Sequence, residues 1–415
     1  MKTTFLRPVL FSLLLCWCLP WTAQAAGNGK ALDGLEAFDA AITNFITKWD
    51  VPGASLAVAK DGKLVLAKGY GVVDKDKDLP VTPQTLFRMG SINKTLTSVI
   101  VMQLVEQGKL KLDDKVIPYF QKLNLVPSNI EDARVQDITV LHLLQHLGGF
   151  DRAKSGDHFF QPRLNAVARR QRTEPVTCEA IVKDALQSKL DFTPGERFAY
   201  SNTGFCMLGK IIEAVTGQTY AAYASQFVLQ PTIGKTFLVG KSMETFQGES
   251  RYHMYQGEQL QWGAPGVSSR KVPTPYGSYS IENMDALGAW VATPTDVLKF
   301  FLAIDGARGQ RLVSPKSFEI MTAPPAIHTE SKVNRYYGTG IYVYRAPGQL
   351  NWYHSGSQPG FQTLALRASG GYSWVIAFNL RPHSDKSAAF FNEFDRALWQ
   401  AAASVKSWPS GDLFE

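Results

Sequence analysis

The chain has 415 residues, of which 45% are hydrophobic, and a formal net charge of +7 at pH 7. This length is long for one hydrophobic core but does not require two independent domains. The mild positive charge gives no indication of a nucleic-acid partner, and no stretch beyond the N-terminus is long and apolar enough to span a membrane. The sequence contains no internal repeat and no low-complexity tract.

The first 25 residues have the pattern of a cleaved secretory signal. Lys2 and Arg7 form a basic start, Val9 to Leu19 is an apolar core, and Ala23 to Ala25 is a small-residue cleavage site. The apolar core is far shorter than the roughly 20 residues of a membrane-spanning helix. We therefore expect an exported protein, periplasmic or secreted, in which residues 26–415 form one domain.

The mature chain begins with a helix and a hairpin. Leu35 to Trp49 has helical periodicity, and two apolar runs on either side of Asp61-Gly62 predict a strand–turn–strand unit. The segment from Ser91 to Gly108 then has the pattern of an amphipathic helix that ends at glycine. Ser91 would lie in the first turn of this helix, with Lys94 on the same face.

From about residue 110 to 300 the pattern is mainly helical, with long polar interruptions. Helices are predicted at 140–147, 178–190 and 203–215, and from Thr293-Pro294 onward. Residues 151–175 are polar and rich in arginine; a solvated surface loop is the favoured interpretation, and a wall of a substrate cleft is the alternative. His142 and His146 have no third ligand nearby, so we interpret them as packing or capping residues.

The last quarter of the chain has a different pattern. Short runs rich in β-branched and aromatic residues predict an antiparallel sheet with strands at 340–344, 350–354, 361–366 and 372–378. A final helix at about 387–405 follows, and we expect the tail after Ser407 to be frayed. Strands at both ends predict an α/β (α+β) fold, in which an antiparallel sheet of N- and C-terminal strands is flanked by helices and carries a large, mostly helical insertion.

Two of the four cysteines, Cys178 and Cys206, lie outside the predicted signal. In an oxidising compartment they would form one disulfide, and two buried free thiols are the alternative. Their positions in the sequence do not decide between the two.

Ser91 and Lys94 have the residue types and spacing of an activated nucleophile. A serine hydroxyl is a weak nucleophile until a nearby base takes its proton, and a partly desolvated lysine amine can do so. The helix N-terminus would also stabilise developing negative charge. The spacing alone is weak evidence, because Ser268 and Lys271 repeat it in a loop-like stretch, and a capping serine with a solvated lysine is the alternative.

Tyr200 and Asn202 stand at the start of the helix predicted at 203–215. Tyr200 could act as a base if a lysine ammonium lowered its pKa, and Asn202 could orient the lysine and a substrate carbonyl. The alternative, favoured by these residues alone, is that Asn202 caps the helix and Tyr200 packs.

His354, Gly356 and Ser357 lie at the end of a predicted strand. The imidazole could bind substrate or assist proton transfer, and the glycine would let a substrate chain approach the backbone. The N–H groups of Ser357 and Ser91 could together form an oxyanion hole.

In this order, Ser-x-x-Lys, Tyr-x-Asn and His-x-Gly resemble the motifs of the serine β-lactamase and penicillin-binding-protein superfamily, nearest its class C β-lactamase and D-aminopeptidase/esterase branch. The flanking residues are similar as well, over 87–90, 104–110, 200–205 and 359–361. The resemblance implies that Ser91 forms an acyl-enzyme, that Lys94 and Tyr200 move the proton, and that Asn202 positions them. It implies no metal or organic cofactor.

One residue departs from the class C pattern. Those β-lactamases have lysine where this chain has His354, and a neutral imidazole would hold a β-lactam carboxylate less well than a permanent cation. The resemblance therefore predicts a serine hydrolase that cleaves an amide or ester, for instance in a peptidoglycan-derived peptide containing D-amino acids. A class C-like β-lactamase and a non-catalytic penicillin-binding-like protein are the alternatives.

Overall fold

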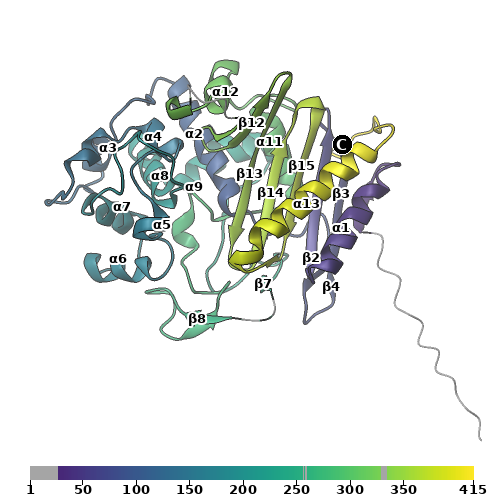
Figure 1. The fold of residues 1–415 in the computed structure, drawn as a ribbon, viewed down its shortest axis with the longest axis horizontal. Helices are drawn as coiled ribbons and strands as arrows, with labels where there is room; N and C mark the ends of the chain where they lie inside the picture. The colour runs from purple at the N-terminus through teal and green to yellow at the C-terminus, as the bar shows by residue number, and fades with distance from the viewer. Residues whose placement is uncertain (1–26, 256, 258, 329–333) are drawn as a thin grey trace, which may run out of the picture.

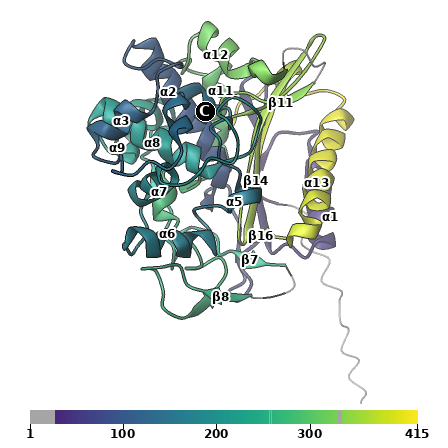
Figure 2. The same cartoon turned by 60° about the vertical axis from the view of Figure 1, so that its left-hand side comes forward.

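The computed structural model describes residues 27–415 except 256, 258 and 329–333. The predicted signal lies outside the described residues. The structure has three layers, with an antiparallel sheet between a pair of helices on one face and a larger group of helices on the other (Figure 1, Figure 2). This arrangement confirms the predicted fold class.

The central sheet has nine strands, of which β4 (Leu79–Pro80) pairs only with β3. In order across the sheet, the other strands are β1 (Asn28–Ala31), β3 (Lys63–Asp74), β2 (Gly53–Lys60), β15 (Tyr372–Phe378), β14 (Phe361–Arg367), β13 (Gln349–Gln358), β12 (Tyr342–Ala346) and β11 (Arg335–Tyr337).

The two ends of the chain meet in the middle of this sheet. β2, from the N-terminal hairpin, pairs with β15, with Leu56 opposite Ile376 and Val58 opposite Trp374. All pairs in the nine-stranded sheet are antiparallel. The hairpin and the four C-terminal strands were thus predicted correctly, although β3 and β13 extend beyond their predicted ends.

The strands bury both of their faces because alternate side chains point to opposite sides of a sheet. On β2, Leu56 and Val58 pack with Trp374 in the core beneath α1 and α13, whereas Ala57 and Ala59 belong to the second core beneath the larger group of helices. The small alanines on that second face let α11 lie close to the sheet.

The helices of the described residues are α1 (Glu36–Lys48), α2 (Asn93–Glu106), α3 (Ile117–Lys122), α4 (Val140–Leu144), α5 (Arg152–Ser155), α6 (Arg163–Gln171), α7 (Cys178–Leu186), α8 (Asn202–Thr216), α9 (Tyr220–Tyr223), α10 (Gln230–Ile233), α11 (Pro294–Ile304), α12 (Pro315–Thr322) and α13 (Ser384–Ser404). The predicted helices at 35–49, 203–215 and 387–405 are confirmed within a few residues. Those predicted at 140–147 and 178–190 end earlier, as α4 and α7.

The helix that follows Ser91 is not amphipathic, contrary to the prediction. Every residue of α2 from Asn93 to Met102 is buried. The helix lies between the sheet and the insertion, so its polar side chains bond to protein rather than water; Thr97, for example, donates to the carbonyl oxygen of Ala286 over 2.6 Å.

The predicted helical insertion also contains short strands. They are β6 (Leu238–Val239), β7 (His253–Met254), β8 (Leu260–Trp262), β9 (Lys271–Pro273) and β10 (Trp290–Ala292). β10 pairs with β6 and with β5 (Phe87–Arg88), the short strand just before Ser91, whereas β7 pairs with β16 (Leu380–Arg381). The insertion thus pairs both with the strand just before Ser91 and with a strand near the C-terminus.

The chain after Ser407 is packed rather than frayed, contrary to the prediction. The Asp412 carboxylate accepts a hydrogen bond of 3.0 Å from the amide of Leu64 and pairs with Arg308. The guanidinium of Arg308 also lies over the ring of Phe414, 4.5 Å from its centroid. These contacts hold the tail against the hairpin of β2 and β3.

Cys178 and Cys206 form a disulfide that joins α7 to α8. The structure thus decides the alternative that the sequence left open. Among the described helices, none is long and apolar enough to cross a membrane.

Candidate active site

Ser91 lies in a 3₁₀ turn, Gly90–Ile92, that leads directly into α2. Gly90 has a positive φ of 54°, and a Cβ at this position would lie 3.0 Å from the ring of Phe361 and 3.1 Å from the amide nitrogen of Ser357. Glycine is therefore required for both conformation and space. The turn brings the chain just before Ser91 against the end of β13.

Gly356 has a different role from the one predicted. A Cβ on Gly356 would collide with the carbonyl oxygen of Met89 and the hydroxyl of Thr363. That space is filled by the protein itself, and Thr363 donates a hydrogen bond of 3.0 Å to Met89 O. Gly356 therefore lets the Met89–Ser91 segment approach β13; it does not open a path for a substrate chain.

Lys94 is fully buried and makes three polar contacts. Its Nζ lies 3.1 Å from Ser91 Oγ, 2.8 Å from Asn202 Oδ1 and 2.9 Å from the carbonyl oxygen of Leu287. Burial lowers the pKa of Lys94 well below its usual value; Asp157 opposes this shift and Arg152 adds to it. The predicted Ser91–Lys94 pair is present in the structure, and the lowered pKa of Lys94 favours the neutral form of its amine.

Asn202 does not cap α8. Ser201 occupies the N-cap position, and its hydroxyl accepts a hydrogen bond from the amide of Gly204. Asn202 instead bridges two groups: its Oδ1 accepts from Lys94, and its Nδ2 donates to Asp157 Oδ2 over 2.7 Å. The interpretation that Asn202 orients Lys94 therefore matches the geometry better than the capping alternative.

Tyr200 reaches the same site from the residue before the N-cap of α8. Lys94 Nζ lies 5.1 Å from its ring centroid, and the Ser91 side chain is close enough to influence the pKa of its hydroxyl. Burial raises the pKa of Tyr200 far above its usual value, and Tyr342 raises it further, although Ser91 and Arg152 oppose this. The expectation that a lysine ammonium would lower this pKa is wrong, because the neighbouring amine is itself disposed to be neutral.

His354 lies on β13 beneath the site and is only 1% exposed. Its Nδ1 bonds to the carbonyl oxygen of Ser355 over 2.7 Å, so Nδ1 carries the proton, and its Nε2 accepts from the Tyr337 hydroxyl over 3.0 Å. Burial lowers the pKa of His354 to about 3, and Lys94 lowers it as well. Both nitrogens are occupied by protein groups, so the predicted direct contact with substrate does not fit this structure.

His146 packs against Tyr200, as expected of a packing residue. The two ring centroids are 4.3 Å apart, and His146 Nδ1 accepts a hydrogen bond of 3.1 Å from the amide of Ser201. His142 forms a capping box with Thr139 at the start of α4. Both histidines therefore have the structural roles that the sequence indicated.

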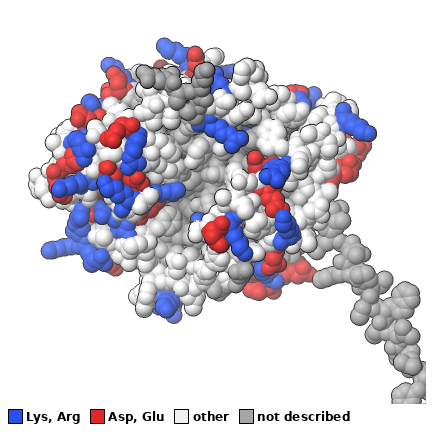
Figure 3. Space-filling view, viewed as in Figure 1, with Lys and Arg blue, Asp and Glu red and all other residues white. Residues whose placement is uncertain are grey.

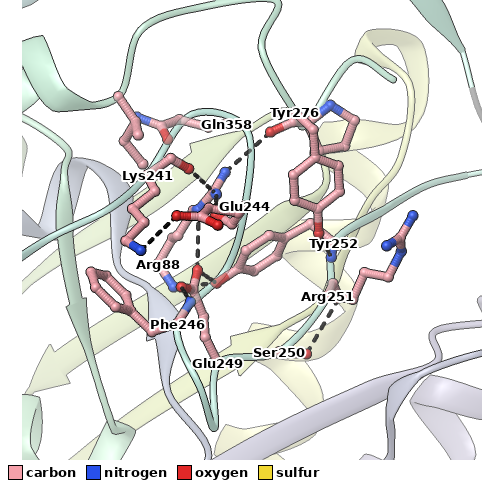
Figure 4. A network of polar contacts seen from close by, with 12 residues as sticks. Arg88, Lys241, Glu244, Phe246, Glu249, Ser250, Arg251, Tyr252, Tyr276 and Gln358 are labelled. Carbon is pink, nitrogen blue, oxygen red and sulfur yellow. Dashed lines mark hydrogen bonds and ion pairs between the residues drawn. The ribbon is translucent and has the colours of Figure 1, made fainter. Parts of the chain in front are cut away.

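A buried arginine fixes β5, the strand that leads into the Gly90–Ile92 turn that carries Ser91 (Figure 4). Arg88 is fully buried; its Nε lies 3.2 Å from Glu249 Oε1, and its other nitrogens donate to carbonyl oxygens of Lys241 and Pro275. The Tyr252 hydroxyl accepts from the amide of Arg88 over 2.8 Å. The sequence indicates no role for Arg88, because only the fold shows that distant segments surround it.

The segment 151–175 forms a wall beside the site and is not a fully solvated loop. It contains α5 and α6, and together with Asn202 it lines a pocket of about 260 Å³. Arg152, at the start of α5, lies over the Tyr200 ring, 4.7 Å from its centroid. The sequence allowed this segment as a cleft wall, but it did not single out Arg152 or Asp157 as site residues, because the arginine-rich composition favoured a surface loop.

The surface between the helical part and α13 is hollowed and mostly uncharged, whereas charged side chains gather on both sides of it (Figure 3). This hollow lies between α5 and β13, the elements that carry Arg152 and His354. Within the part of the chain that the structure describes, no cluster of three or more histidine, cysteine or acidic residues has the arrangement of a metal site.

The comparisons agree with this fold and site. The Beta-lactamase family model matches residues 38–397, which is most of the chain. The chain therefore belongs to the Beta-lactamase family. Protein flp of Staphylococcus aureus (strain NCTC 8325 / PS 47) is 30% identical over 275 residues, which cover 64% of this chain and 51% of that protein. The chain thus spans about half the length of the curated relatives it matches first.

Solved structures give the same fold. The octameric penicillin-binding protein homologue from Pyrococcus abyssi superposes with a TM-score of 0.64 at 26% identity, over 88% of this chain and 76% of that one. The D-amino acid amidase from Ochrobactrum anthropi SV3, in complex with D-phenylalanine, gives a TM-score of 0.69 at 22% identity, over 90% and 99% of the two chains.

Proposed function

We propose that this protein is a serine hydrolase that forms an acyl-enzyme on Ser91 and cleaves an amide or ester, with peptides containing D-amino acids as the substrate class. The observation that carries the proposal is the set of three contacts at Lys94 Nζ. A neutral amine has two N–H donors and one lone pair. The carbonyl oxygens of Asn202 and Leu287 take the two donors, which leaves the lone pair for the Ser91 hydroxyl proton.

The first chemical step follows from this arrangement. Lys94 accepts the Ser91 proton while Oγ attacks the substrate carbonyl, so the amine becomes an ammonium as the oxyanion forms. The Tyr200 hydroxyl, protonated because of its raised pKa, donates its proton to the leaving group and regains one from Lys94. Water then attacks the acyl-enzyme and releases the acid, with the same groups acting in reverse.

The oxyanion would be held by the N–H groups of Ser91 and Ser357. The closeness of Gly90 to the Ser357 amide supports this assignment, because it puts the nucleophile turn beside the end of β13. Two such donors stabilise the charge that develops in the transition state. His354 would act indirectly, by holding Tyr337 and the β13 backbone.

The substrate class rests on the fold neighbours and on His354. The amidase neighbour was solved with D-phenylalanine, and another neighbour is a penicillin-binding protein homologue. Because His354 is neutral and buried, it does not offer the cation of a class C β-lactamase. For this reason we prefer a peptidase, amidase or esterase activity to the β-lactamase alternative.

We also propose that the protein works in the periplasm or outside the cell, as one catalytic domain over residues 26–415. The predicted signal supports export, and the Cys178–Cys206 disulfide is typical of an oxidising compartment.

Labelling with a fluorophosphonate and a fluorescent penicillin, read by intact mass, tests the proposal. We expect one adduct on the wild-type protein and none on Ser91→Ala, with Ser268→Ala as the control that labels normally. Undiminished labelling of Ser91→Ala would refute the assignment of Ser91 as the nucleophile. A lasting penicillin adduct would support the hypothesis of a peptidase, whereas rapid hydrolysis of penicillin would favour the β-lactamase alternative.

A further inference from the structure

Arg152 places an exposed cation at the site. Its guanidinium lies 4.7 Å from the Tyr200 ring centroid, and the residue lines the same pocket as Asn202 and Asp157. The side chain is exposed, so its charge faces the solvent that a substrate would displace. The positive charge of Arg152 is close enough to act on the reacting groups, and it lowers the pKa of Lys94 and of Tyr200.

Arg152 has no carboxylate partner among the described residues, unlike other arginines near the pocket. Arg163 and Arg170 both pair with Asp184, at 2.6 and 3.3 Å, and Arg197 pairs with Asp151 at 2.8 Å. Asp157 lies in the same pocket, but its carboxylate accepts a hydrogen bond from Asn202. The guanidinium of Arg152 is therefore available to a ligand.

Among the described residues at the centre of the site, neither His354 nor Lys94 offers a free cation to an anionic substrate. His354 is neutral, and both of its ring nitrogens are bonded within the protein. Lys94 is buried and needs its lone pair for Ser91. A substrate anion would have to be bound by a cation at the edge of the site.

We propose that Arg152 is a specificity-determining residue that binds a carboxylate on the leaving-group side of the substrate. The proposal rests on the function proposed above. Arg152 covers Tyr200, the group that donates a proton to the leaving group, so a carboxylate that reaches Arg152 belongs to the part of the substrate that departs. A planar guanidinium suits this partner because it can bind both carboxylate oxygens at once.

Matched thioesters test this assignment. Hippuryl thioglycolate has a carboxylate on its leaving group, and its methyl ester lacks that charge. We expect the wild-type protein to have a higher kcat/KM for the acid, and Arg152→Ala to reduce the ratio of the two kcat/KM values at least tenfold. Arg152→Lys should restore part of the ratio, and Arg169→Ala, an exposed arginine in the last turn of α6, should keep it.

Each other outcome refutes a specific claim. An unchanged ratio in Arg152→Ala would overturn the carboxylate assignment. An equal loss on both thioesters would also overturn it, because Arg152 would then act only through Tyr200. If the wild-type protein is folded and turns over neither thioester, and neither acylates Ser91, the proposed function fails and this inference fails with it.

Discussion

The carboxylate of Asp157 accepts a hydrogen bond of 2.7 Å from the Asn202 side-chain amide, and this bond determines which atom of Asn202 faces Lys94. Because Nδ2 is held by Asp157, Oδ1 points to the lysine amine. Asp157 thus contributes in two ways, by orienting Asn202 and by raising the pKa of Lys94 against the larger effect of burial.

Asp157→Asn should shift the pH dependence of acylation. The rate rises with pH as Lys94 loses its proton, and removal of the Asp157 charge lowers the pKa of Lys94 further. We therefore expect the rising limb of kcat/KM to move to lower pH, whereas the new side chain can still accept from Asn202. Asp113→Asn, at an exposed site, is the control. A limb that stays in place would show that Lys94 is not the group that titrates.

Asn202→Leu should lower turnover by roughly a hundredfold or more, because Lys94 loses an acceptor and can turn away from Ser91. The Ser91 hydroxyl itself is untouched, so steady-state kcat/KM measured beside circular dichroism separates this loss from unfolding. Near-normal turnover of a folded variant would remove Asn202 from the mechanism.

Gly356→Ala should destabilise the protein and reduce the labelling of Ser91, although no proposed catalytic side chain changes. The added methyl collides with the Met89 carbonyl oxygen and with Thr363, so the nucleophile turn has to move. Overpacking of this kind costs about 1–3 kcal/mol of stability. Gly204→Ala, where a Cβ meets its nearest atom at 3.5 Å, is the matched control. Urea unfolding and fluorophosphonate labelling, measured on both variants, check the prediction; equal behaviour of the two would contradict it.

His354 should make the protein sensitive to acid. Its pKa is about 3 in the folded protein and about 6.5 in the unfolded chain. Between these values the unfolded chain binds a proton that the native state excludes, so stability falls as pH decreases from about 6.5 to 3, by up to about 1.4 kcal/mol per pH unit. His354→Gln should flatten this dependence in urea unfolding at pH 7, 6, 5 and 4. Parallel curves for the two proteins would contradict a buried neutral imidazole.

Loss of the disulfide should destabilise the helical part. Cys178 and Cys206 are 28 residues apart, and closing a loop of this size typically contributes about 2–4 kcal/mol. The double variant Cys178→Ala, Cys206→Ala should lose that amount in urea unfolding and should no longer respond to reductant. A wild-type protein equally stable with and without reductant would refute the prediction.

Much of the fold was predictable because the strands and helices at the two ends have clear periodicities. The hairpin around Asp61-Gly62 and the strand at 372–378 were recognised separately, and their pairing followed from the need to complete one sheet. The buried character of α2 was not predictable, since its polar residues look like a solvated face until the partners of Thr97 and Asn93 are known.

The residues of the candidate site that belong to sequence motifs were predictable. Ser91, Lys94, Tyr200 and Asn202 meet because two helix N-termini converge. The roles of Gly356 and His354 depend on what fills the space around them, and a sequence does not show that. Asp157 and Arg152 lie in a segment whose composition is also typical of a surface loop.

The meeting of β2 and β15 has a consequence for the order of events during synthesis. A growing chain already contains Ser91 and Lys94 when about a quarter of it has been made. β15, which pairs with β2, and β13, which abuts the turn that carries Ser91, come from the last part of the chain. Contacts this distant in sequence form late and slowly. If Ser91 is the nucleophile, as proposed, we therefore expect it to become reactive only when nearly the whole chain has folded, and fragments that end before residue 378 to contain Ser91 without its reactivity.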